Sequence, residues 1–170
     1  MLLIAGVIYL FSLLIEGRPV FIKQERIGEN NKPFFIYKFR TMRIGSEEIS
    51  PTKINDKRVT RFGKVLRKYY LDEMPQILNV ILRNMNFVGP RPERPIYVKE
   101  FVGIIPNYNL RHQVKPGITG WQQVNSSYSF ENIPQKQAYD MYYIEHRSVI
   151  FDLYIVLRTF LTILSGSGRF

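Results

Sequence analysis

The first residues of the chain are the feature that most restricts its fold. Residues 2–15 (LLIAGVIYLFSLLI) form a run of 14 residues without a charge. As an α-helix with a rise of ~1.5 Å per residue the run would extend about 21 Å, whereas the hydrocarbon core of a bilayer is about 30 Å thick. The run therefore predicts a buried core helix, a signal-peptide core, or a segment that enters a membrane from one face. No basic residue precedes it and no small-residue cleavage site follows it, which disfavours the signal peptide.

Positive charge begins directly after this run. Residues 18–68 hold 14 basic and 5 acidic residues, a net charge of +9 out of the +10 of the whole chain. Such a stretch predicts a polyanionic partner. The candidates are nucleic acid, an anionic membrane surface and a phosphate-rich small molecule. Basic residues that adjoin an apolar segment are typical of the anionic side of a membrane. We therefore expect residues 1–16 to be a partial, re-entrant membrane helix rather than a core helix.

The C-terminal part of the chain contains a second apolar segment. Residues 149–164 (VIFDLYIVLRTFLTIL) predict a helix whose polar side chains share one arc, while the rest of its surface is almost wholly apolar. The residues on the arc are Asp152, Arg158, Thr159 and Thr162. A helix of this kind suits the edge of a hydrophobic core or the plane of a membrane interface. Two apolar segments at opposite ends of a basic chain favour the interface.

Between these ends the sequence predicts a small α+β domain that is rich in helix. Short aromatic and β-branched runs at 20–22 and 34–39 flank a hairpin-like turn at 28–33, and residues 45–56 are polar and predict a loop. Residues 60–70 and 72–82 predict two helices, the second with Pro75 in its first turn. The apolar content of 45% excludes a disordered chain. The absence of Cys excludes disulfide scaffolds, Cys-ligated zinc and thiol nucleophiles, and two His leave little room for a His-based metal centre.

The remaining candidate for chemistry is the pair Asp72-Glu73. In isolation, Asp72 would serve as the N-cap of the helix that follows, and Glu73 would complement the helix dipole. The surroundings favour a functional interpretation, because a cluster of basic residues precedes the pair and Gly89-Pro90-Arg91-Pro92 follows its helix. Arginines and backbone donors bind phosphate chains, and adjacent carboxylates can hold Mg²⁺ or attack phosphorus. The basic residues that precede the pair Asp72-Glu73 are Arg58, Arg61, Lys64, Arg67 and Lys68.

Six ordered motifs carry a resemblance to a known family. They are 38–42 (KFRTM), 56–63 (DKRVTRFG), 71–76 (LDEMPQ), 79–80 (NV), 88–92 (VGPRP) and 115–121 (KPGITGW). On these motifs the chain resembles the bacterial sugar transferases, which are monotopic phosphoglycosyl transferases, from about residue 17 to its end. Residues 89–95 (GPRPERP) and the tail after residue 143 resemble the hexose-1-phosphate transferases of exopolysaccharide and O-antigen assembly.

The resemblance implies a reaction at the cytoplasmic face of the bacterial inner membrane. A UDP-sugar would donate its sugar phosphate to a polyprenyl phosphate, usually undecaprenyl phosphate, and UMP would be released. By resemblance Asp72 is the nucleophile that forms an aspartyl-phosphosugar intermediate, and Glu73 helps to bind the cofactor Mg²⁺. The implied partners are the donor, the lipid acceptor and membrane lipids, without nucleic acid, and a homodimer is a further option. Residues 1–16 would be the membrane-inserted part and residues 17–170 the catalytic domain.

Further motif residues are candidates for substrate binding. Arg91, between Pro90 and Pro92, is the best of these, because in the family this element lies near the nucleotide. Arg67 would clamp the diphosphate, with a solvated helix face as the alternative. The other candidates, which structural ion pairs would equally explain, are Lys38, Arg40, Arg58 and Lys115. We expect His112 to be structural rather than a catalytic base.

The chain departs from the family pattern in two places. Family members usually begin with a basic cluster and a longer apolar stretch with a Ser-Pro break, so Met1 would correspond to a point inside the second half of that stretch. Where many members carry Gly-Asp or Gly-Glu before Met-Ser, this chain has Arg83-Asn84-Met85-Asn86. Two alternatives to the enzyme therefore stay open at this point. One is a catalytically impaired, membrane-associated remnant, and the other is a basic module that binds anions or nucleic acid.

Overall fold

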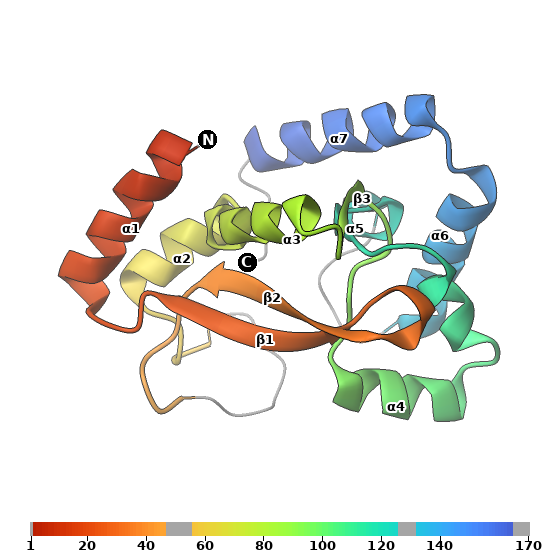
Figure 1. Cartoon of the computed structure of the whole chain (residues 1–170), viewed down its shortest axis with the longest axis horizontal. Helices are drawn as coiled ribbons and strands as arrows, with labels where there is room; N and C mark the ends of the chain where they lie inside the picture. Colours follow the sequence, from red (N-terminus) through yellow and green to blue (C-terminus); the bar gives the residue numbers. More distant parts are fainter. Residues whose placement is uncertain (1, 47–55, 126–131, 165–170) are drawn as a thin grey trace. The chain divides into compact units, whose positions relative to one another are not determined.

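The computed structural model describes residues 2–46, 56–125 and 132–164 (Figure 1). Helices and two small sheets alternate along it, which confirms the predicted α+β class. The greater part of the loop predicted at 45–56 lies outside the described residues. The chain divides into two compact units. The first comprises Met1–Lys23, Tyr37–Pro75 and Thr162–Phe170, and the second comprises Gln24–Ile36 and Gln76–Leu161. The expected division after residue 16 stays a prediction.

The first unit is built on helices α1 (Leu2–Glu16) and α2 (Arg61–Lys68). The start of strand β1 (Phe21–Ile27) and the end of strand β2 (Pro33–Phe39) also belong to it, and the two strands form one hairpin in which they run in opposite directions (Figure 1). Its core brings together apolar side chains of α1, of α2, of the end of β2 and of the residue before β1. The buried members are Ile8, Val20, Phe39 and Leu66.

Helix α2 begins and packs as its sequence predicts. The Thr60 hydroxyl accepts a hydrogen bond of 2.9 Å from the Gly63 N–H, which makes Thr60 the N-cap. A Cβ atom on Gly63 would lie 2.2 Å from the carbonyl oxygen of Thr41. Glycine costs helix stability, but here it lets the helix backbone contact the chain that follows β2. The predicted helix at 60–70 is therefore confirmed, with slightly shorter bounds.

The second predicted helix, at 72–82, is wrong as a single helix. Residues Leu71–Gln76 form a 3-10 helix, η2, and only Ile77–Ile81 form an α-helix, α3. Pro75 lies inside η2, where it has no N–H to donate and its ring hinders an α-helical turn before it. Asp72 is consequently the second residue of a 3-10 helix and does not precede an α-helix as its N-cap.

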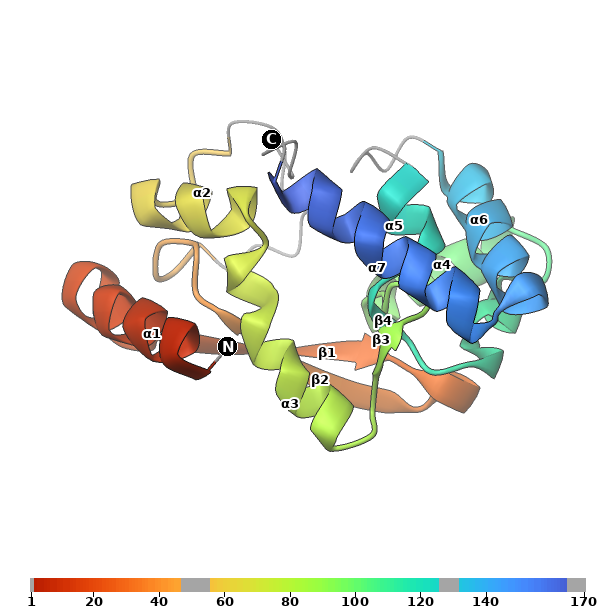
Figure 2. The ribbon, with the colours of Figure 1, turned by 90° about the horizontal axis from the view of Figure 1, so that it is seen from above.

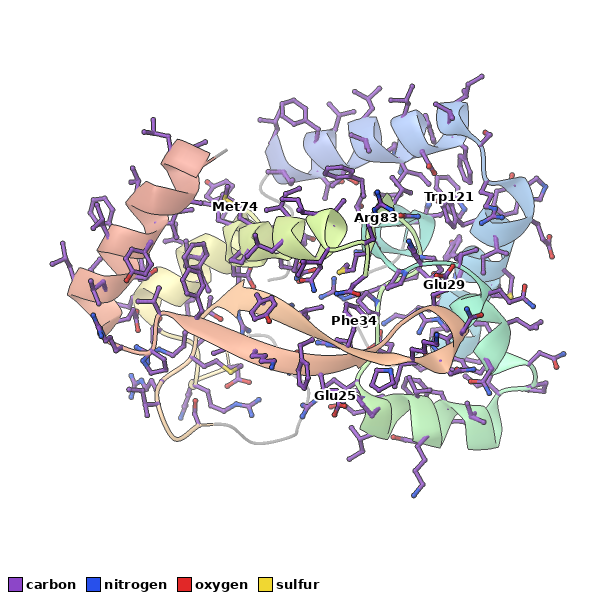
Figure 3. The ribbon with its side chains drawn as sticks, in the orientation of Figure 1. Glu25, Glu29, Phe34, Met74, Arg83 and Trp121 are labelled. Carbon is purple, nitrogen blue, oxygen red and sulfur yellow. The ribbon has the colours of Figure 1, made fainter. Side chains whose placement is uncertain are left out.

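The second unit contains the tip of the hairpin and most of the elements after η2. A short 3-10 helix, η1 (Glu29–Asn31), closes the hairpin, and Glu29 and Phe34 lie at this tip (Figure 3). Strands β3 (Asn86–Val88) and β4 (Gly117–Thr119) pair in parallel, with Asn86 opposite Gly117. The helices of this unit, besides α3, are α4 (Pro95–Ile104), η3 (Tyr108–Gln113), α5 (Trp121–Asn125), α6 (Ile133–His146) and all but the last three residues of α7 (Val149–Leu164).

The bounds of α7 coincide with the predicted segment, and its polar arc faces the protein. Asp152 accepts a hydrogen bond of 2.9 Å from the Tyr143 hydroxyl, and Thr159 shares one of 2.7 Å with Thr119. Figure 2 shows α7 running across β3, β4 and α5. Trp121, labelled in Figure 3, lies at the start of α5 with its ring 5.1 Å from that of Phe151 in α7. The aromatic side chains of this region therefore pack together.

The apolar arcs of three helices are exposed. In α7, Ile150 is 81% exposed and Leu153 is 64% exposed. Helix α1 exposes Leu3 and Leu14, and α3 exposes Ile81, while Asn79 of α3 is fully buried. This polarity is the reverse of that of a helix on a water-soluble core. Within the described residues, no helix is both long and apolar enough to cross a bilayer.

Candidate functional site

The centre of the candidate site is a buried ion pair between β2 and η2. The Lys38 Nζ atom lies 2.7 Å from Oε1 of Glu73, and both side chains are at least nine-tenths buried. In β2, Lys38 is buried like Ile36 two residues before it, because alternate residues of a strand share one face. Two residues that lie 35 positions apart in the chain are thus joined by a charge-assisted hydrogen bond in a water-poor environment.

Asp72 lies beside this pair in the chain and is only 3% exposed. It follows a sharp turn in which Tyr70 has a φ of +56°, a left-handed conformation that is uncommon for an aromatic residue. This turn ends α2 and lets η2 begin at once. The first unit therefore buries two consecutive carboxylates, Asp72 and Glu73, on a tight 3-10 helix.

Arg67 and Arg40, two predicted substrate-binding residues, contact the protein close to this centre. The Nε of Arg67 donates a hydrogen bond of 2.7 Å to the Thr41 hydroxyl. Arg40 donates from Nη2 to the carbonyl oxygens of Glu16 and Gly17, where α1 ends. Cations at the C-terminus of a helix stabilise its dipole. In the structure, Arg40 therefore fixes the end of α1.

Arg58 forms the structural ion pair that its sequence context allows. Its guanidinium contacts both carboxylate oxygens of Asp56, with Nη2 at 2.6 Å from Oδ2. Asp56 also lines a cavity of about 370 Å³ in the first unit. Four cationic side chains line the same cavity, namely Arg43, Lys57, Arg61 and Lys64. This cavity concentrates part of the positive charge of residues 18–68.

The remaining predicted residues belong to the second unit. Pro90 and Pro92 are buried, and Arg91 between them is half-buried. Lys115 is half-buried and lines a cavity of about 260 Å³, together with Arg147 and Asp152. The structure thus places Lys38, Arg40, Arg58, Arg67, Asp72 and Glu73 in the first unit, and Pro90, Arg91, Pro92 and Lys115 in the second.

The second unit contains a buried polar cluster that no sequence motif predicts. Arg111 forms an ion pair of 2.7 Å with Asp140, donates to the Tyr108 hydroxyl at 2.6 Å, and donates to the carbonyl oxygen of Arg91 at 2.9 Å. Burial raises the pKa of the Asp140 carboxyl to about 6, although the Arg111 charge opposes this shift. Burial also raises the pKa of the Tyr108 hydroxyl. An Arg followed 29 residues later by an Asp gives no sequence signal of such a pairing.

His112 is structural, in line with the sequence analysis. Its side chain is 6% exposed, and its Nδ1 lies 2.6 Å from Oδ1 of Asn31. Burial and the neighbouring Arg111 charge lower the pKa of His112 to about 4. The imidazole is therefore neutral in the folded protein near pH 7, and Nδ1 donates its proton to the Asn31 oxygen.

The carboxylates of the first unit fit a magnesium ion only together with a phosphate ligand. Within the described ranges, no group of three or more His, Cys, Asp or Glu side chains is arranged to hold a metal. Mg²⁺, however, is commonly bound by one or two carboxylates plus substrate phosphates and water. Glu73, with Asp72 beside it, supplies that kind of donor set, and the Lys38 contact already occupies one oxygen of Glu73.

Comparisons with known proteins connect this arrangement to a family. Residues 1–166 match the family described as "Bacterial sugar transferase". The chain belongs to the bacterial sugar transferase family. Every motif quoted above lies within the matched residues, so the resemblance noted in the sequence is confirmed.

Three relatives of this bacterial sugar transferase illustrate the match. The chain is 44% identical over 88% of its length to the UDP-N-acetylgalactosamine-undecaprenyl-phosphate N-acetylgalactosaminephosphotransferase of Aeromonas hydrophila. It is 38% identical over 98% of its length to the UDP-glucose:undecaprenyl-phosphate glucose-1-phosphate transferase of Escherichia coli. It is 37% identical over 96% of its length to the uncharacterized sugar transferase EpsL of Bacillus subtilis, of which it covers 81%. The chain spans only 36% and 37% of the first two relatives.

Proposed function

We propose that this chain transfers a sugar 1-phosphate from a UDP-sugar to undecaprenyl phosphate, with release of UMP. The observation that carries the proposal is the family match over nearly the whole chain, with relatives named for this reaction. The site adds a chemical reason, since two consecutive carboxylates are buried beside a lysine in the first unit. Such groups are suited to nucleophilic attack on phosphorus and to binding a cation.

In the proposed first step, an Asp72 oxygen attacks the phosphorus that bears the sugar. A bond forms between this oxygen and phosphorus, the bond from phosphorus to the bridging oxygen breaks, and UMP leaves with the electron pair. In the second step a phosphate oxygen of undecaprenyl phosphate attacks the same phosphorus, and the Asp72 carboxylate is released. A soluble donor and a lipid acceptor thereby react in turn at one side chain, which predicts ping-pong kinetics.

Lys38 and Glu73 support this nucleophile in the proposed mechanism. Lys38 holds the Glu73 carboxylate through their 2.7 Å contact. Glu73 would bind Mg²⁺ together with the diphosphate oxygens of the donor, and the ion would neutralise charge on the departing UMP. Arg91 would bind the diphosphate or nucleotide through its guanidinium. Lys115 and Arg67 stay candidates for further contacts with the substrate.

The reversed polarity of α1, α3 and α7 supports a location at a membrane. We propose that α1 enters the cytoplasmic leaflet of the bacterial inner membrane from one face and that α7 lies in the interface plane. Their exposed apolar side chains would then be covered by lipid, and the basic residues after α1 would contact anionic headgroups. In this position the enzyme could take up an acceptor that never leaves the bilayer.

The experiment that tests the function measures UMP release in detergent with Mg²⁺ and undecaprenyl phosphate. UDP-glucose, UDP-galactose and UDP-N-acetylgalactosamine serve as donors. We expect release with at least one donor, and complete loss in Asp72→Asn. Asp152→Asn is the matched control, because an asparagine still offers an oxygen to the Tyr143 hydroxyl.

The proposed intermediate has its own test. With the active donor and no acceptor, the protein should gain the mass of one sugar phosphate on the peptide that contains Asp72, with about one equivalent of UMP per enzyme. No adduct despite turnover would refute the covalent mechanism. Retention on DNA without UMP release from any donor would instead support the basic binding module.

A further inference from the structure

Four consecutive backbone carbonyls of the Pro90–Glu93 segment are each held by a donor from another part of the second unit. The Pro90 carbonyl accepts from the Gly117 N–H at 3.0 Å, and the Glu93 carbonyl accepts from the Ile27 N–H at 2.9 Å. Between them, the Arg91 carbonyl accepts from Nη2 of Arg111 at 2.9 Å, and the Pro92 carbonyl accepts from Nη1 of Arg26 at 2.9 Å. Pro90 and Pro92 have no N–H, so the segment cannot join a regular ladder, and these outside donors define its path.

The two arginine donors are themselves fixed. Arg111 is 4% exposed, and Asp140 and Tyr108 bind its other guanidinium nitrogens. Arg26 is 8% exposed, donates to the Gln24 side chain, and lies 3.7 Å from Glu93. A guanidinium is planar and directs its donors along fixed axes, so a carbonyl that it binds is held in position.

We propose that Arg26 and Arg111 are positioning residues for Arg91, and that Asp140 orients Arg111. By holding the carbonyls on either side of the Arg91–Pro92 bond, they fix the backbone from which the Arg91 guanidinium reaches the donor diphosphate. The proposal rests on the proposed function, in which Arg91 contacts the donor. None of these three residues lies in a motif that points to a substrate.

Lysine substitutions separate positioning from mere stability. In Arg111→Lys the charge that faces Asp140 is kept, but one ammonium cannot reach Asp140, Tyr108 and the Arg91 carbonyl together. Arg26→Lys tests in the same way whether the Arg26 guanidinium holds the Pro92 carbonyl. The control is Phe101→Leu, which removes volume from the buried cluster around Tyr108 and leaves all four donors to the Pro90–Glu93 carbonyls in place.

The first measurement needs no substrate. Hydrogen exchange of the peptide that covers residues 88–97 should become faster at the Arg91 and Glu93 amides in both lysine variants, and should stay as in wild type in Phe101→Leu. Unchanged exchange in the lysine variants would overturn the claim that these arginines hold the segment, whatever the enzyme does.

The second measurement concerns the donor. We expect the Kd of UDP with Mg²⁺ and the KM of the active UDP-sugar to rise about tenfold in each lysine variant, with kcat within about threefold, because ground-state binding is what Arg91 provides. Phe101→Leu should keep the Kd and the KM of the wild type, even if its thermal stability is equal to or lower than that of the lysine variants. Faster exchange with an unchanged Kd would overturn the positioning role and leave the proposed function standing. A wild-type protein that neither binds UDP nor releases UMP would refute the proposed function, and with it the role of Arg91, while the exchange result would still decide whether the segment is held.

Discussion

Lys38 and Glu73 form a buried ion pair whose Nζ and Oε1 atoms are 2.7 Å apart, and it joins strand β2 to the 3-10 helix that carries Asp72. Breaking such a pair by removing one partner is costly, because the carboxylate that remains cannot regain its hydration. The same lysine therefore serves the fold and the candidate site at once.

Lys38→Met should lower the free energy of unfolding by about 3 kcal/mol, because the Glu73 carboxylate loses its ammonium neighbour inside the protein. Urea unfolding in detergent measures the change. Lys64→Met, in the exposed part of α2, is the control and should shift stability by less than about 0.5 kcal/mol. Equal effects of the two substitutions would show that the ion pair contributes nothing to stability.

Gly63→Ala should destabilise the protein even though alanine is the better helix former. The new Cβ would lie 2.2 Å from the Thr41 carbonyl oxygen, and relief of such overlap typically costs about 1–3 kcal/mol. Gly103→Ala, in α4, is the matched control, since its Cβ meets nothing within 4 Å. This control should gain about 0.5–1 kcal/mol from helix propensity. Thermal unfolding of both variants checks the opposite signs, and a stabilising Gly63→Ala would contradict the close approach of α2 to Thr41.

His112 should make the folded state less stable as the pH falls from about 6.5 to about 4. The pKa of His112 in the folded protein, about 4, lies below the 6.5 of an ordinary histidine, so the unfolded chain binds a proton first in this window. Over the whole window the loss amounts to about 3 kcal/mol, since each pKa unit corresponds to about 1.4 kcal/mol. The measurement is the stability of wild type minus that of His112→Gln as a function of pH.

The comparison with His112→Gln also removes the contribution of Asp140. That carboxyl has a raised pKa of about 6, so it favours the folded state as the pH falls from about 6 to about 4 and opposes His112. Because Asp140 is present in both proteins, its effect cancels in the difference. A difference that stays constant between pH 7 and pH 4 would rule out a neutral buried His112.

The exposed apolar arc of α7 should matter for the membrane and not for folding. Replacing Leu153 and Leu157 by Ser should reduce retention on vesicles that contain anionic lipid, with a change in stability in detergent of less than about 0.5 kcal/mol for each site. Ile155→Ala is the opposite case, because Ile155 is fully buried. Truncation of the Ile155 side chain should lower the free energy of unfolding by about 2–5 kcal/mol. Full vesicle retention of the double Ser variant would argue against α7 as an interfacial helix.

Local patterns were sufficient to predict α2 and α7, because each has a cap or an apolar period that acts within one helix. They failed at residues 71–76, where the apolar spacing indicates an α-helix but the Pro75 ring would clash with the Leu71 carbonyl in an α-helical turn. Asp72 and Glu73 were recognisable as candidates from their motif. The contact of Glu73 with Lys38, and that of Arg111 with Asp140, depend on how distant segments fold together, which no spacing in the sequence encodes.

The inward polar arc of α7 changes what attaches this helix to its neighbours. Hydrogen bonds contribute to the attachment, beside the packing of Ile155: Thr159 shares one with β4, Asp152 accepts one from α6, and Arg158 donates one to α5. Hydrogen bonds strengthen as the local dielectric constant falls, whereas apolar attraction weakens when water is replaced by hydrocarbon. When α7 moves from water to a lipid surface, its hydrogen bonds to the rest of the protein should therefore become stronger. The bilayer would act as a solvent that favours the state in which α7 is attached to its neighbours.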